Sequence, residues 1–133
     1  MKIILDAMGG DNAPDEIVKG AAQAVAENRD NLTLVLVGNE EIIRASAAKQ
    51  NIALDEHFEI VNTTQTIEMC DEPAKAIRAK KDSSMVVGLR MLAEGKGDAF
   101  VSAGSTGAVV CGATLLVKRI KGVRRAAIGT VIP

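Results

Sequence analysis

Three short segments of the 133-residue sequence combine residue types that could bind a small anion. In the first segment, residues 6–11, Asp6 and Asp11 flank the pair Gly9-Gly10 directly after an apolar run. Glycines let the backbone approach a ligand closely, and the two acids could orient donors or bind water. A tight turn that caps a helix explains the same residues, and the spacing alone slightly favours that interpretation.

The second segment, residues 102–107, consists of small residues between an apolar run and a helical pattern. Small residues at a helix N-terminus leave backbone N–H groups free at the positive end of the helix dipole, which suits a phosphate or a developing oxyanion. The hydroxyls of Ser102, Ser105 and Thr106 add donors. Turns of this kind also occur for packing alone, and the residues leave both interpretations equally open.

The third segment is basic and ends on two serines. The spacing predicts that Arg78 and Lys81 share a helix face, while Ser83 and Ser84 begin the next helix, so that cations lie beside further free N–H groups. An anion is the expected ligand. A solvated basic face is the usual meaning of such a run, and composition alone favours the solvated face.

The sequence offers little support for a nucleotide site, a histidine base, a disulfide or a metal site. The turn after the first apolar run lacks the G-x-G-x-x-G spacing and no P-loop motif occurs, which disfavours nicotinamide and ATP. His57, the single histidine, lies in a polar turn and is expected at the surface. Cys70 and Cys111 fit neither a disulfide framework nor a zinc spacing, so reduced thiols in a cytoplasmic protein are predicted. No metal site and no cofactor are predicted.

Composition also limits the partners. Sixteen lysines and arginines nearly balance seventeen aspartates and glutamates, and two phenylalanines are the only aromatic rings, so a nucleic-acid partner is not expected. An acid follows the first apolar run too early for a secretory signal, and the longest apolar stretch, 107–117, is shorter than the roughly 20 residues that a membrane-spanning helix needs. The basic run over 118–125 reads as a solvated loop that would suit docking of an acidic protein.

These segments must be positioned by regular elements. Short segments rich in apolar residues predict strands over 2–6, 32–37, 58–62, 98–102 and 126–132, and the continuous aliphatic run over 32–37 is typical of a parallel strand covered on both faces. Helical periodicity predicts helices from Pro14 through 25 and over 40–50, 73–78, 85–94 and 106–117. Asp11 or Asn12 is expected to cap the first of these helices. Met69, Met85 and Met91 are expected in the core. The alternation predicts one doubly wound α/β domain over 1–133, with a mostly parallel sheet and helices on both faces, although the strand order stays open.

The segments together resemble the PlsX family of phosphate acyltransferases. The resemblance rests on five motifs in order and spacing: DAMGGD at 6–11 with Pro14, DEP at 71–73, R-x-K-K-x-S-S-M at 78–85, SAG-x-TGA at 102–108 and RIKG at 119–122. It implies a fold like that of isocitrate and isopropylmalate dehydrogenases and of phosphotransacetylases. Family members are longer, so the chain is expected to be the N-terminal part of such an enzyme.

The resemblance further implies an enzyme that makes acyl phosphate from fatty acyl-acyl carrier protein and inorganic phosphate in bacterial phospholipid synthesis. The partners expected on this basis are the carrier protein, phosphate, a second copy in a homodimer and, through other parts of the protein, a membrane surface. A short-chain phosphotransacetylase and a phosphate-binding or carrier-binding module without catalysis remain the alternatives. Family members usually carry asparagine where this chain has Ser105.

The hypothesis assigns a role to each segment. Phosphate would contact Arg78, Lys81 and Ser84, and the backbone around 104–107 with Ser105 and Thr106 would stabilise the oxyanion or hold a second phosphate. The residues predicted to catalyse are Lys81, Arg78, Ser105 and Thr106, and those predicted to bind substrate are Asp6, Gly9, Gly10, Asp11, Ser83, Ser84, Ser102, Gly104 and Gly107.

Overall fold

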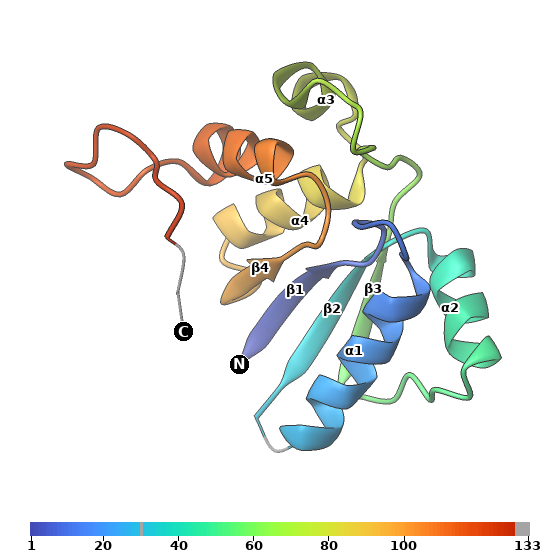
Figure 1. Ribbon diagram of the computed structural model, residues 1–133. Helices are drawn as coiled ribbons and strands as arrows, with labels where there is room; N and C mark the ends of the chain where they lie inside the picture. The colour runs from blue at the N-terminus through green and yellow to red at the C-terminus, as the bar shows by residue number, and fades with distance from the viewer. Residues whose placement is uncertain (30, 130–133) are drawn as a thin grey trace.

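The computed structural model describes residues 1–29 and 31–129 (Figure 1). The elements follow in the order β1 (Lys2–Asp6), α1 (Asp15–Glu27), β2 (Thr33–Gly38), α2 (Glu40–Lys49), β3 (Phe58–Asn62), α3 (Pro73–Ala79), α4 (Ser84–Ala93), β4 (Ala99–Val101) and α5 (Thr106–Gly112). A π-helical turn, η1 (Ala113–Val117), continues α5. Four of the five predicted strands and all the predicted helices therefore form, close to the expected bounds.

The four strands form one parallel sheet in the order β3-β2-β1-β4. Asp6 at the end of β1 pairs with Val37 in β2, and Leu5 pairs with Val101 at the end of β4. The chain adds β2 and β3 on one side of β1 and then returns to place β4 on the other side. In open α/β sheets the crevice beyond the carboxyl ends of the strands at such a reversal is where ligands bind. The turns that follow β1 and β4 lie at this position.

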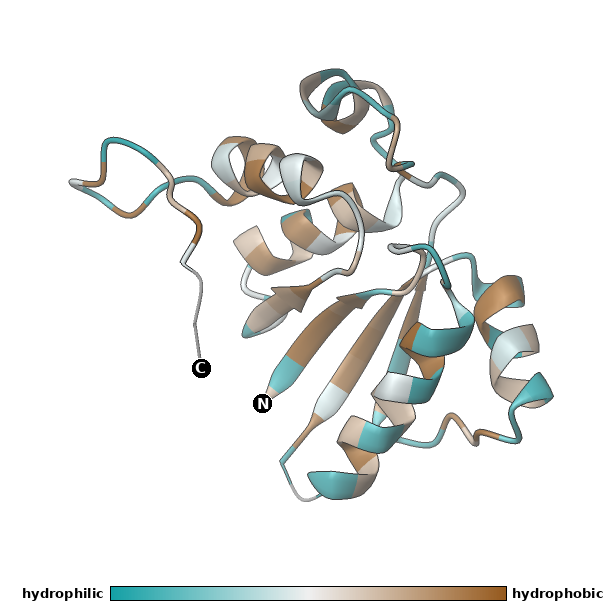
Figure 2. Ribbon diagram, viewed as in Figure 1, coloured by the Kyte–Doolittle hydropathy of each residue, from teal (hydrophilic) through white to brown (hydrophobic). Residues whose placement is uncertain are grey.

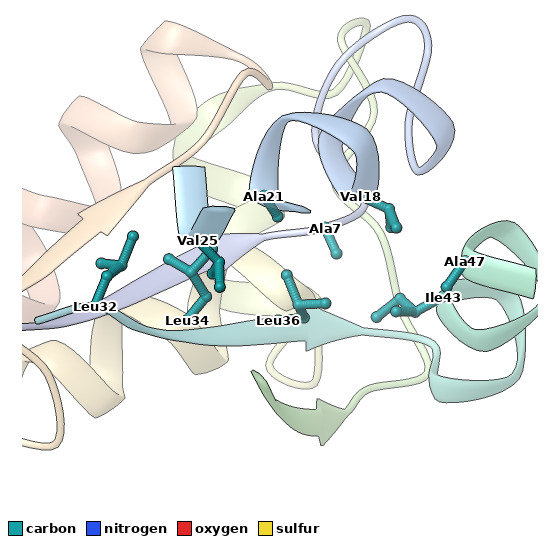
Figure 3. Packing of buried hydrophobic residues seen from close by; sticks show 9 residues of the cluster. All are labelled: Ala7, Val18, Ala21, Val25, Leu32, Leu34, Leu36, Ile43 and Ala47. Atoms are coloured by element: carbon teal, nitrogen blue, oxygen red, sulfur yellow. The ribbon is translucent and has the colours of Figure 1, made fainter. Parts of the chain in front are cut away.

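Helices cover both faces of the sheet, as predicted for a doubly wound α/β chain. Helices α1 and α2 lie on one face, where nine buried side chains form a cluster (Figure 3). On the opposite face, Ile4, Val35 and Val37 pack against α4 and Phe100. Strands β1 and β2 are correspondingly mostly hydrophobic, whereas α1 and α2 alternate between hydrophilic and hydrophobic residues (Figure 2).

A second cluster fixes the helices near the carboxyl end of the sheet. It is formed by Ile67, Ala76, Ile77, Met85, Val86, Leu89 and Ala108 from α3, α4, α5 and the segment before α3. Met85 is buried as predicted, but Met69, also expected in the core, has 60% of its surface exposed. This cluster holds the first turns of α4 and α5 in fixed positions relative to α3.

Three predicted local features are wrong. Helix α1 begins at Asp15 with Pro14 in the N-cap position and no side-chain capping bond, so neither Asp11 nor Asn12 caps it. Helix α3 ends at Ala79 because Lys80 leaves the helical conformation, so Lys81 lies beyond the helix and does not share a helix face with Arg78. His57 is half-buried rather than at the surface, since its ring nitrogen Nδ1 lies 3.3 Å from the carbonyl oxygen of Leu32.

The predicted fifth strand is not formed over residues 126–129, and the remainder of 126–132 lies outside the described residues. A strand needs a partner edge for its N–H and C=O groups, and residues 126–129 are exposed and pair with no strand of the described chain. No helix within the described residues is long and apolar enough to cross a membrane.

Candidate functional site

The buried carboxylate of Asp6 joins the turns that follow β1 and β4. Only 1% of Asp6 is exposed. Its Oδ2 accepts a hydrogen bond from Ser102 Oγ at 2.8 Å, and its Oδ1 accepts one from the Met8 backbone N–H at 3.1 Å. Ser102 Oγ in turn accepts from the Gly104 N–H at 3.1 Å. Asp6 and Ser102 therefore act as one unit that sets the conformation of both turns.

The glycines after β1 let these two turns touch. A Cβ atom added to Gly9 would lie 2.7 Å from Asp6 Oδ2 and 2.8 Å from Ser102 Oγ. Gly10 has φ +110°, in the region that favours glycine, and a Cβ there would lie 3.2 Å from that of Ala103. The sequence predicted that these glycines let the backbone approach a ligand, whereas the close approach that the structure shows is to the second turn of the same chain.

The turn over residues 102–107 presents free backbone donors. Ser105 Oγ caps α5 by accepting from the Ala108 N–H at 3.3 Å, and the carbonyl of Ser105 accepts from Val109. Among the described residues, no acceptor bonds the N–H groups of Ser105, Thr106 and Gly107. Three consecutive N–H groups at the start of a helix can bind an oxyanion. This turn is called the donor turn below.

The start of α4 presents fewer donors. Ser83 Oγ accepts from the Val86 N–H at 3.4 Å, and the Ser84 N–H donates to the carbonyl of Gln65 at 3.3 Å. The side chains of Ser83 and Ser84 are both buried. Ser83 is therefore the cap of α4, and the N–H groups here are mostly satisfied within the described chain.

The cations of the third segment divide into two kinds. Lys80 Nζ contacts Asp71 Oδ2 at 2.5 Å and the Thr66 carbonyl at 2.9 Å, and so ties the segment before α3 to the end of that helix. The bond from Lys80, followed by one from the Glu68 N–H, holds the pKa of Asp71 below its usual range. Arg78 and Lys81 are exposed and form no ion pair within the part of the chain that the structure describes. Their charges remain available to a ligand.

Contacts bring the three predicted segments to one end of the sheet. A Cβ added to Gly104 would lie 3.5 Å from Met85 Cε in the first turn of α4, and one added to Gly107 would lie 3.1 Å from Pro73 Cγ in α3. The donor turn thus touches the beginnings of both helices and, through Ser102, the turn after β1. Asp11 is exposed at the tip of its turn and takes no part in the Asp6–Ser102 unit.

A cavity of about 410 Å³ borders this site. Its lining combines apolar and sulfur-bearing side chains with two carboxylates, and consists of Met8, Gly10, Asp11, Ile67, Glu68, Met69 and Cys70. Gly10 also touches Ala103, so the cavity lies next to the turn that follows β4. This cavity could not be predicted from the sequence, because its walls come from two segments 56 positions apart, at Asp11 and Ile67, that only the fold brings together. No group of three His, Cys, Asp or Glu side chains suited to a metal occurs in 1–29 and 31–129.

Comparison with known proteins gives one family and one fold. A family model described as "Fatty acid synthesis protein" matches residues 1–133. A phosphate acyltransferase of Caldicellulosiruptor bescii is 52% identical over all of this chain and 39% of its own length, and one of Clostridioides difficile is 46% identical over all of this chain and 38% of its own length. This chain therefore spans about two-fifths of such relatives. EutD phosphotransacetylase from Staphylococcus aureus superimposes with a TM-score of 0.65 and 24% identity over 94% of this chain and 40% of that one, so the two share a fold.

Proposed function

Because the chain belongs to the fatty acid synthesis protein family, in which its relatives are named phosphate acyltransferases, we propose that it is the N-terminal α/β part of an enzyme that makes acyl phosphate from a fatty acyl thioester and inorganic phosphate. The observation that carries the proposal is the donor turn. It presents three free N–H groups at the reversal point of the sheet and contacts the beginnings of α3 and α4; Arg78 lies in α3, and Lys81 lies between the two helices. A phosphate or an oxyanion is the ligand that such a turn favours.

In the proposed reaction the protein mainly has to position the phosphate and the thioester. Phosphate groups titrate at about pH 6, so bound phosphate is already a competent nucleophile. Its oxygen attacks the thioester carbonyl, the C–O bond forms, and collapse of the tetrahedral intermediate breaks the C–S bond. The leaving thiolate then takes a proton from solvent, which is easy for a thiol with a pKa of about 8.5. Neither a histidine base nor a strong acid is needed, and positioned donors supply the catalysis.

The geometry suggests how the work is divided. The N–H groups of the donor turn, with the Thr106 hydroxyl, stabilise the oxyanion or hold phosphate, and Arg78 and Lys81 attract the phosphate. Asp6 and Ser102 keep the donor turn in position. Ser84 contributes less than the sequence suggested, because its side chain is buried. The cavity lined by Met8, Ile67 and Met69 would hold the thioester end of the donor. Asp11 and Glu68 also line this cavity, and their carboxylates would repel phosphate from it.

The donor in this proposal is a fatty acyl-acyl carrier protein. The complete enzyme would be a homodimer with an isocitrate dehydrogenase-like fold that reaches the membrane surface through parts beyond this chain. One alternative is a phosphotransacetylase that uses short acyl-coenzyme A, favoured by the shared fold with EutD. The other is a phosphate-binding or carrier-binding module without catalysis, since free N–H groups at a helix N-terminus can bind phosphate without turnover.

A donor comparison tests these functions. Acyl phosphate, trapped with hydroxylamine, would be measured for this chain and for a full-length relative, with long-chain acyl-carrier protein and with acetyl-coenzyme A. We expect the relative to use the carrier-bound donor at least tenfold better. Preference for acetyl-coenzyme A would replace the proposal with the phosphotransacetylase, and saturable phosphate binding without turnover by either protein would favour the binding module.

A further inference from the structure

The charges of the chain are distributed very unevenly. All seventeen acidic residues lie at or before Asp98, and none occurs in the 35 residues that follow. Five of the sixteen basic residues lie within eight positions, at Lys118, Arg119, Lys121, Arg124 and Arg125. The formal net charge of −1 therefore hides a strongly cationic segment on an otherwise acidic chain.

This cationic segment leaves the end of η1 and projects away from the sheet (Figure 1). It turns at Gly122, where φ is +92°, and the Val123 N–H donates to the Ile120 carbonyl at 3.0 Å. The Arg119 guanidinium also donates to the backbone carbonyl of Arg124, which closes the turn. None of the five cations forms an ion pair with any described residue.

Apolar side chains are exposed between these cations. Ile120 is 81% exposed, Val123 is 47% exposed, and hydrophilic and hydrophobic residues alternate along the segment (Figure 2). The segment and the helix before it enclose a groove of about 370 Å³. Its apolar walls include Val110, Ala113, Val117, Ile120, Val123 and Ala126, and Lys118 and Arg119 also line it. We call this groove, with the five cations around it, the basic groove.

Simpler explanations cover only part of the basic groove. Cations at a helix C-terminus stabilise the helix by interacting with the negative end of its dipole, which accounts for Lys118 and Arg119 directly after η1. The dipole falls off within about one turn, so it does not explain Lys121, Arg124 and Arg125. A solvated loop, in turn, does not explain an exposed Ile120 over an apolar groove. Binding of a single-stranded nucleic acid by base stacking would require aromatic rings, and this segment has none.

We propose that the basic groove docks an amphipathic helix of an acidic protein, with the apolar stripe of that helix in the groove and its carboxylates on the surrounding cations. This inference rests on the proposed function for the identity of the partner, which is then the acyl carrier protein. The five cations follow the end of η1, whereas the donor turn begins α5 at the other end of the twelve residues, or roughly 18 Å, that the two elements span, and the groove runs between them along Val110, Ala113 and Val117. A docked partner must therefore deliver its acyl group on a flexible arm that reaches along this helix.

Binding of a fluorescently labelled acyl carrier protein to this chain tests the inference. The double variant Lys121→Glu/Arg125→Glu should weaken binding at least tenfold in low salt. The control Lys19→Glu/Lys96→Glu makes the same change in net charge at exposed positions elsewhere and should change binding less than twofold. Ile120→Ser should weaken binding several-fold without changing charge, because it removes the apolar contact. Circular dichroism would verify that each variant is folded.

The inference would be overturned if the unsubstituted chain showed no measurable binding of the carrier protein, or if the two double variants weakened binding equally. It would also be overturned if the chain bound vesicles of equal parts phosphatidylglycerol and phosphatidylcholine more tightly than it bound the carrier protein and Lys121→Glu/Arg125→Glu abolished the vesicle binding. Failure of the proposed function is a separate result. It would be seen when a full-length relative forms no acyl phosphate from a small acyl-pantetheine thioester, a donor that bypasses docking.

Discussion

At the scale of single residues, the site depends on one buried carboxylate. Asp6 is almost completely inaccessible, yet it is bonded to a hydroxyl and a backbone N–H and to no cation in the described chain. A buried carboxylate is costly unless hydrogen bonds satisfy it, so the Asp6–Ser102 unit constrains both turns strongly. The role we assign to Asp6 is therefore to position the donor turn, without contacting substrate.

The first prediction concerns the contact between the two turns. Gly9→Ala should lower the free energy of unfolding by about 1–3 kcal/mol, because the new methyl group would lie within 3 Å of Asp6 and Ser102 and force the turns apart. Gly20→Ala is the matched control, since nothing lies within 4 Å of the added atom in α1 and alanine favours a helix by up to about 1 kcal/mol. Urea unfolding of both variants checks this. Equal midpoints for the two would show that the turns do not need their close contact.

At the scale of elements, the first turn of α5 has to be held by a cap while its N–H groups stay free. Ser105 provides that cap through its hydroxyl. The resemblance to the PlsX family places asparagine at this position, and both serine and asparagine are good N-cap residues. The departure from the family pattern therefore preserves the structural role, whatever it changes in contacts to a ligand.

The second prediction separates the cap from the ligand contact. Ser105→Ala should destabilise the chain by about 1 kcal/mol through loss of the capping bond, while Ser105→Asn should change stability by less than half of that. Thermal or urea unfolding measures both. A loss of stability in Ser105→Asn as large as that in Ser105→Ala would mean that Ser105 does more than cap the helix.

The third prediction is a pH dependence at the end of α3. The pKa of Asp71 is lowered, mainly by Lys80, so its ion pair stabilises the fold above the ordinary aspartate pKa of about 3.9 and is lost as the pH falls through the lowered value. The stability difference between the unsubstituted chain and Asp71→Asn should thus be constant above about pH 5 and shrink below pH 4. Lys80→Met should reproduce the behaviour of Asp71→Asn. A difference that stays constant down to pH 2.5 would contradict the pairing.

Much at this scale could be predicted from the sequence. The apolar run that ends at Asp6 and the aliphatic run before Gly38 located β1 and β2 to within one residue, and the segment after a polar turn located β3; a continuous aliphatic run such as that of β2 is typical of a strand buried on both faces. Prediction from the residue pattern was wrong where contacts with other parts of the chain decide the conformation. Pro14 and the turn before it, not a side-chain cap, set the start of α1, and residues 126–129 find no strand to pair with in the described chain.

The candidate site was only partly predictable. Small residues before a helix identified the donor turn, and the run 78–85 identified two available cations. Sequence could not reveal that the β1 and β4 turns meet, because this follows from the strand order, nor that most N–H groups at the start of α4 are already satisfied. Lys80 belongs to the same basic run as Arg78 and Lys81. Only the structure shows that Lys80 is paired with Asp71 and so differs from the other two cations.

At the scale of the whole molecule, one face of the sheet is left incompletely covered. A groove of about 470 Å³ lies beside α1, with Ile3, Leu5 and Val101 of the sheet among its walls, and Val101 is 49% exposed. Apolar grooves of this kind on a sheet with an open edge strand promote association. A chain that spans two-fifths of its relatives is expected to show this property.

The fourth prediction follows from this description. The chain should unfold cooperatively, because its sheet is covered by helices on both faces, yet its acyl transfer should be below about 1% of that of a full-length relative. The site is open to water, which weakens each electrostatic contact in it. Unfolding curves, sedimentation and the hydroxylamine assay measure these properties. Turnover equal to that of the relative by a monomeric preparation would show that residues 1–133 contain the whole active site.

The claim that this chain binds phosphate at the donor turn is tested most directly by titrating the ¹⁵N-labelled chain with inorganic phosphate and following its amide resonances. We predict saturable shifts that are largest for Ser105, Thr106 and Gly107. Lys81→Ala should weaken binding about tenfold or more, the loss of a charge-assisted hydrogen bond, whereas Lys75→Ala, which removes an exposed cation already paired with Glu72, should not. Shifts that are largest over 118–125 and respond to Arg124→Ala and not to Lys81→Ala, or shifts that never saturate, would contradict the account.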